Sequence, residues 1–201
     1  MKYLTLAVVT FCIIAISACT CSTCGKQSDF PEFPQTVKDG AENYIINKTG
    51  KDFFDKNIFP NLLSSKKLNG LYEMHYIFRM IDYDFVNEPI VIFLDSLGVV
   101  NEKYEVRGIP ECLENEENCT FNIDEKKAIE IAKENNLADG IRDWEVSFRW
   151  YAKLKQYVWH IISTKKEIGN IDSDMYKADG EEIIINPYSG EVLFKTDWKI
   201  N

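Results

Sequence analysis

Apolar side chains recur at every second position in several stretches of this chain, a spacing that places them on one face of a β-strand. The clearest stretches are residues 71–81, 144–151 and 157–161. Residues 89–100 and 181–194 each combine a β-branched run, a turn that contains glycine, and a second apolar run. Glycine supplies the positive φ that such turns need. The pattern therefore predicts two sets of antiparallel strands joined by tight turns.

A helical spacing precedes the first set of strands. Val37, Ala41 and Ile45 are separated by four residues each and would form one apolar helix face. Thr36 is the expected N-cap, because its hydroxyl can accept a hydrogen bond from the first turn. Gly50 is the expected end of the helix.

A second helix is predicted before the second set. Asn122 and Glu125 have the spacing of a capping box, and the narrow stripe of small and apolar side chains that follows would let the helix approach a sheet closely. That stripe is Ala128, Ile131 and Ala132. The polar residues 165–180 predict a long loop before the last pair of strands.

The two halves share an internal repeat. The run Y-x-M-H-Y-I at residues 72–77 aligns with Y-x-W-H-I-I at residues 157–162, an offset of 85 residues. A helix, then strands, then a strand-turn-strand occurs twice in the same order. We therefore predict an α+β fold of two tandem units, each a helix packed on a small antiparallel sheet.

The N-terminus has the pattern of an export signal. Lys2 precedes an apolar stretch at residues 4–16, which is shorter than the ~20 residues that a membrane span needs. Ser17, Ala18 and Cys19 follow, and this ending resembles the bacterial lipobox. The resemblance implies removal of residues 1–18 and a lipid on Cys19. The alternative is an ordinary secretory signal that happens to end at a cysteine.

Charge narrows the set of partners. The formal net charge is −9, so nucleic acid is not an expected partner, because its phosphates require clusters of Lys and Arg. Anionic lipid headgroups are equally unsuitable. Membrane contact is expected through the lipid anchor alone. Thr20, rather than Asp, follows the lipid cysteine and favours the outer membrane over the inner one.

The cysteines agree with an oxidising compartment. Of six cysteines, Cys12 lies in the signal and Cys19 is the lipidation site. An even number remains, which suggests disulfides. The remaining four are Cys21, Cys24, Cys112 and Cys119. We expect local pairing, Cys112 with Cys119 and Cys21 with Cys24; a redox or metal role for the C-x-x-C pair is the alternative.

These features divide the chain into five parts. They are a signal peptide (1–18), a tether (19–34), a first unit (35–107), an acidic linker closed by a disulfide (108–120) and a second unit (121–201).

No catalytic, metal or cofactor site is predicted. The chain contains no H-E-x-x-H, G-x-S-x-G or G-x-x-x-x-G-K motif. Its two histidines, His75 and His160, occupy equivalent places on the strand face opposite the aromatic one. A metal site or pH switch is conceivable for them. We favour two partly exposed sheet residues that the repeat places alike.

The second unit resembles the PepSY domain. The similarity rests on D-E-K-K-A-I-E-I-A at residues 124–132, Y-V-W-H-I at residues 157–161 and I-I-I-N-P-Y-S-G-E-V-L at residues 183–193. Asn186 stands where the family usually has an acid, and the first unit matches weakly. The resemblance implies cystatin-like units in the cell envelope and a peptidase-regulating role that has been proposed for the family. No catalytic residues can be transferred from the family to this chain. Tandem inhibitor-like lipoproteins are a similar-looking alternative.

The sequence thus predicts a non-enzymatic, lipid-anchored protein of the bacterial cell envelope. Its expected partner is an envelope protein or an extended peptide, and regulation of a peptidase is one form this binding could take. A free sheet edge could accept the partner as an added strand. The alternative is a structural or assembly lipoprotein of the outer membrane.

Overall fold

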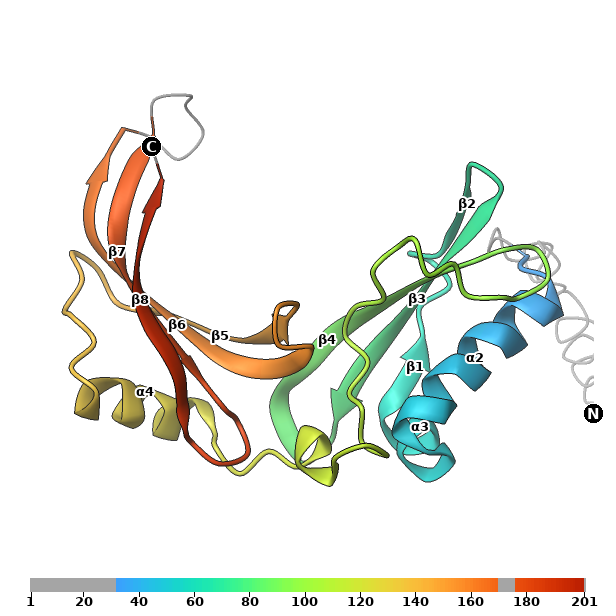
Figure 1. The fold of residues 1–201 in the computed structure, drawn as a ribbon, viewed down its shortest axis with the longest axis horizontal. Coiled ribbons are helices and arrows are strands. Elements are labelled where there is room, and N and C mark those ends of the chain that lie inside the picture. The colour runs from blue at the N-terminus through green and yellow to red at the C-terminus, as the bar shows by residue number, and fades with distance from the viewer. Residues whose placement is uncertain (1–31, 170–175, 201) are drawn as a thin grey trace, which may run out of the picture. The chain divides into compact units, whose positions relative to one another are not determined.

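The protein has a mixed α+β fold with two antiparallel sheets, as the sequence predicts (Figure 1). A computed structural model describes residues 32–169 and 176–200. Within them the helices are α2 (Gln35–Thr49), α3 (Lys51–Asn57), the short 3-10 helix η1 (Glu116–Cys119) and α4 (Glu125–Glu134). The strands are β1 (Ile58–Pro60), β2 (Lys66–Leu68), β3 (Leu71–Met80), β4 (Tyr83–Leu94), β5 (Glu145–Tyr151), β6 (Gln156–Ile168), β7 (Lys177–Ile185) and β8 (Val192–Ile200).

The first sheet is built around β3. Strand β4 pairs with one side of β3, and the short strands β1 and β2 pair one after the other with its opposite side. The alternation on β3 has the predicted effect, because every second side chain is buried against the helices. These side chains are Tyr72, Met74, Tyr76 and Phe78. Helix α2 contributes the predicted apolar face of Val37, Ala41 and Ile45, all fully buried.

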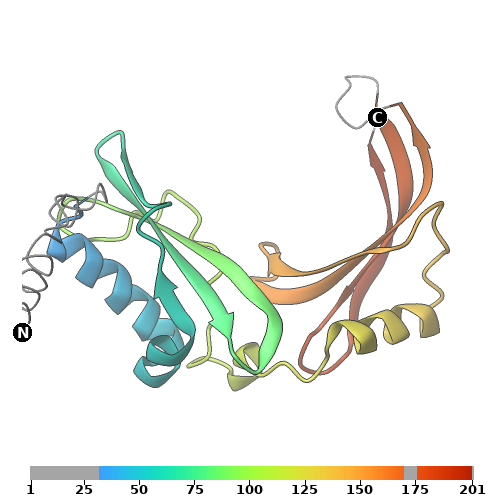
Figure 2. The same cartoon turned by 180° about the vertical axis from the view of Figure 1, so that it is seen from behind.

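The second sheet is a meander in the order β5-β6-β7-β8 (Figure 2). Helix α4 packs on β5 and β6 through the predicted stripe of Ala128, Ile131 and Ala132. The turn at residues 186–190 closes as expected: the amide of Gly190 donates to the carbonyl of Asn186 at 2.9 Å, and Gly190 has a φ of 77°.

Several predicted boundaries are wrong. Strand β4 begins at Tyr83, not at residue 89, because its first half pairs with β3 although polar side chains interrupt its alternation. The predicted loop at residues 165–180 contains strand at both of its ends, and its middle, residues 170–175, lies outside the described residues. Strand β6 continues to Ile168 and β7 begins at Lys177, since backbone ladders hold these polar segments together without an apolar face.

The predicted helix caps also need correction. Asp124, not Asn122, is the N-cap of α4, because its side chain accepts from the Lys127 amide at 2.7 Å. Helix α2 begins directly after Pro34, so Thr36 lies inside its first turn. Gly50 ends α2 as expected, with a φ of 84°, and a second helix, α3, follows it at once.

One hydrophobic core contains side chains from both sheets. Its centre is a set of aromatic rings with centroids 4.9–6.4 Å apart. These rings belong to Phe78, Phe85, Phe121, Phe148, Tyr157 and Trp159. The buried hydroxyl of Tyr157 also donates to the carbonyl of Gly108 at 2.8 Å. Residues of the predicted linker and of both predicted units therefore contact each other directly.

Candidate functional site

A groove lies beside strand β5. It is bounded by helix α4 and by the loop that joins α4 to β5. The cavity has a volume of about 600 Å³. Its lining comes from Ile129, Lys133, residues 139–144 and Val146. We call this cavity the β5 groove. Its lining combines apolar side chains from α4, the loop and β5 with charged side chains from α4 and the loop.

The loop that forms one wall is held by several hydrogen bonds. The indole Nε1 of Trp144 donates to the Ala138 carbonyl at 3.0 Å, and the Ile141 amide donates to the Thr164 carbonyl at 2.8 Å. Arg142 forms ion pairs with Glu145, at 2.9 Å, and with Glu167. These contacts connect the loop to β5 and β6, so the groove wall is formed before any ligand arrives.

Glu181 on β7 also holds the start of the same loop. Its carboxylate accepts from the Ala138 amide at 3.2 Å and pairs with Lys165 at 3.0 Å and Lys195 at 3.1 Å. The hydrogen bond from Lys165 and the contacts to Ala138 and Lys195 lower the pKa of Glu181 to about 2, although burial acts in the opposite direction. Lys195 also donates to the Asn136 carbonyl at 2.6 Å, next to the end of α4.

The groove presents apolar surface beside an exposed strand edge. Ile141 is 61% exposed although its loop is held in place, and Ile129, Trp144 and Val146 are half-buried. In the part of the chain that the structure describes, β5 pairs only with β6, and no backbone hydrogen bond joins residues 145–150 to any segment other than β6. An edge strand offers N–H and C=O groups to a further strand. The groove can thus bind an apolar side chain of a ligand segment while the edge of β5 forms hydrogen bonds with the backbone of that segment.

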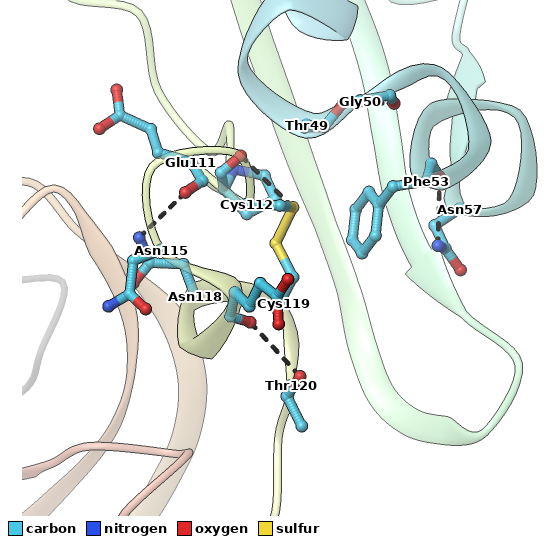
Figure 3. The surroundings of a disulfide bond; sticks show 12 residues. Thr49, Gly50, Phe53, Asn57, Glu111, Cys112, Asn115, Asn118, Cys119 and Thr120 are labelled. Carbon is cyan, nitrogen blue, oxygen red and sulfur yellow. Dashed lines mark hydrogen bonds between the residues drawn. A yellow bond between two sulfur atoms is a disulfide. The ribbon is translucent and has the colours of Figure 1, made fainter.

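The cysteines predicted to pair within the linker form a disulfide. Cys112 and Cys119 have Cα atoms 5.5 Å apart, within the usual range for a disulfide. Figure 3 shows the bond beside the junction of α2 and α3, where Gly50 and Phe53 lie. The Leu113 amide donates to the Lys48 carbonyl at 3.0 Å, which fastens the loop to α2. No residue of the disulfide loop lines the β5 groove.

The other predicted site residues cannot be placed. Cys19, Cys21 and Cys24 lie outside the described residues. The lipid anchor and the second disulfide therefore remain predictions.

Each histidine pairs with a glutamate. The Nε2 atom of His75 lies 2.7 Å from Glu73, and that of His160 lies 2.7 Å from Glu182. His75 is partly exposed as predicted, but His160 is buried at 6% exposure. The prediction was wrong for His160 because the sheet's outer face is covered there by neighbouring side chains, including Tyr151. Burial lowers the pKa of His160, although Glu182 acts against the shift.

Sequence patterns do not identify the β5 groove. Its members come from a helix, a loop and a strand, and none belongs to a recognisable motif. One signal was present: Ile141 is a lone aliphatic residue within the polar run D-G-I-R-D. In the described ranges no helix is long and apolar enough to cross a bilayer, and no cluster of metal-ligating side chains is found.

The chain was compared with known proteins. No protein-family model matches it, and no curated protein matches it.

Proposed function

We propose that this protein is a lipid-anchored, non-enzymatic protein of the bacterial cell envelope that binds an extended segment of another protein in the β5 groove. The observation that carries the proposal is the exposed Ile141 on a firmly held loop, beside a cavity of mixed apolar and charged lining and a strand, β5, that pairs only with β6 in the described chain. Exposed apolar surface that is fixed before binding is typical of recognition sites.

The edge of β5 that is unpaired in the described chain suggests how the partner segment would bind. A segment that aligns with β5 would gain backbone hydrogen bonds, and one of its alternate side chains would enter the groove. Ile129, Trp144 and Val146 favour an aliphatic or aromatic residue there. The charged lining residues Lys133, Asp139 and Asp143 would contact its polar neighbours.

The proposal includes tandem PepSY-like, cystatin-like units. Both halves place a helix before an antiparallel sheet with a long central strand. The repeated histidines have matching neighbours in the ladder: His75 faces Val91 on β4, and His160 faces Ile184 on β7. If this relationship holds, a peptidase is the partner class that the resemblance suggests.

Cross-linking at the groove tests the binding site. A photo-cross-linking residue in place of Asp143 is expected to capture an envelope protein in living cells. The product should decrease strongly when Ile141→Glu is added, because the entering apolar side chain of the partner would remove water from the carboxylate at position 141. Binding should fall about tenfold or more.

A matched substitution controls for this effect. Ile168 on β6 is 67% exposed and lies outside the groove lining, so Ile168→Glu should leave the product intact. Loss of the product in both variants, or in neither, would count against the β5 groove.

The anchor has its own test. The wild-type protein should have an intact mass that corresponds to loss of residues 1–18 plus acyl chains, and Cys19→Ala should release it from membranes. An unmodified, soluble wild-type protein would contradict the anchor.

A further inference from the structure

A second cavity lies where β4 approaches the end of β5, and its lining is unusually basic for this chain. It has a volume of about 580 Å³. Three cations from separate segments line it: Arg107 after β4, Arg149 on β5 and Lys153 in the β5–β6 hairpin. The chain as a whole has a net charge of −9. We call this cavity the Arg149 cleft.

Few carboxylates lie close enough to neutralise these three cations. In the described ranges Arg149 and Lys153 have no carboxylate within 4.0 Å, and Arg107 pairs with Glu105 at 3.0 Å on the exposed surface. Glu88 is the one acid of the cleft lining. Burial raises the pKa of Glu88 to about 7, although Arg149 acts to lower it. Near neutral pH this acid is therefore partly protonated and repels an anion less than an ordinary glutamate.

The guanidinium of Arg149 is oriented by a chain of polar groups across three strands. Its Nη1 lies 3.5 Å from Nδ1 of His160, whose Nε2 contacts Glu182 at 2.7 Å. The geometry fits a neutral imidazole that donates from Nε2 to Glu182 and accepts at Nδ1 from Arg149. The buried His160 thus contacts one edge of the guanidinium, and in the described residues the rest of the fork makes no other hydrogen bond.

The remaining walls are apolar and aromatic. They come from Pro89, Val91, Trp150, Tyr151 and Ala152. Such walls suit a hydrocarbon or aromatic body, while the guanidinium fork matches the two oxygens of a carboxylate.

We infer that the Arg149 cleft binds a carboxylate attached to an apolar group. Two sources share this chemistry: the C-terminus of a peptide that ends in an apolar residue, and a free apolar acid. The site is independent of the β5 groove, because no residue lines both cavities.

A titration with defined probes tests the inference. The probes are 3-phenylpropionate, its amide, and acetyl-Gly-Gly-Phe with either a free carboxylate or an amide at its end. Binding is followed by chemical shifts of the isotope-labelled protein. The two carboxylates are expected to shift the signals of Arg149, Trp150 and Lys153, and each should bind at least about tenfold more tightly than its amide.

Two variants identify the contact. Arg149→Gln should weaken carboxylate binding about tenfold and leave amide binding unchanged, since it removes the charge and keeps a polar side chain. Lys199→Gln makes the same charge change on β8, outside the cleft lining, and should change affinity less than twofold.

The outcomes separate the two sources. A tripeptide that binds well above the free acid supports a peptide terminus, and equal binding supports a small acid. Equal binding of acids and amides, or no effect of Arg149→Gln, would overturn the inference. Neither result depends on cross-linking at Asp143.

Discussion

Replacing Phe148 with alanine is expected to lower the free energy of unfolding by about 3–5 kcal/mol. The side chain is 6% exposed and lies at the centre of the core. Its ring centroid is 5.0–5.5 Å from those of four other aromatic residues. These are Phe85 on β4, Phe121 before α4, and Tyr157 and Trp159 on β6. Truncation would leave a cavity that faces both sheets.

Urea unfolding followed by two probes measures this loss. Because the core is shared, the variant should still unfold in one transition, with signals from both sheets shifting together. Phe59→Ala is the control: its ring is 40% exposed, so its cost should stay below about 1 kcal/mol. Two separate transitions, with only one of them shifted by Phe148→Ala, would show that the sheets do not share their stability.

Replacing Gly40 with alanine is expected to destabilise the protein by about 1–3 kcal/mol, although alanine is the better helix former. Gly40 lies within α2, and a Cβ atom there would overlap the backbone carbonyl of Gly98. A Cβ on Gly98 would in turn overlap the Thr36 carbonyl. The helix and the turn after β4 therefore approach backbone to backbone, and neither can move away without disturbing the core.

The same unfolding experiment tests this second substitution. Asn43 lies on the exposed side of α2, and Asn43→Ala should leave stability unchanged or raise it by a few tenths of a kcal/mol. A Gly40→Ala protein as stable as the Asn43→Ala protein would contradict the close approach at Gly98.

Much of the fold could be predicted from periodicity. The alternation on β3, the helical spacing of Val37, Ala41 and Ile45, and the turn at Gly190 each depend on local physics, and each is found in the structure. The errors occur where polar residues form strands. The later part of β6 and the start of β7 have no apolar face and are held by backbone pairing, which leaves no mark on the hydrophobic pattern.

The candidate sites could not be predicted because they depend on three-dimensional neighbours. The β5 groove needs α4 beside β5, and the Arg149 cleft needs the end of β5 beside β4. His160 illustrates what the sequence could not predict. Its position in the repeat was evident from sequence, but its contacts with Arg149 and Glu182 come from two other strands. The disulfide could be predicted from the sequence because the two cysteines are only seven residues apart.

Hydrogen–deuterium exchange on the complex is the most direct test of partner binding at the β5 groove. The partner segment identified by cross-linking at residue 143 would be synthesised and added in excess to the wild-type protein. Binding to the edge predicts slower amide exchange in β5 and at residues 139–144, with exchange in β8 unchanged and with a smaller effect in Ile141→Glu at the same concentration of the segment. Slower exchange along β8 instead, or unchanged exchange in β5, would contradict binding of the partner at this edge.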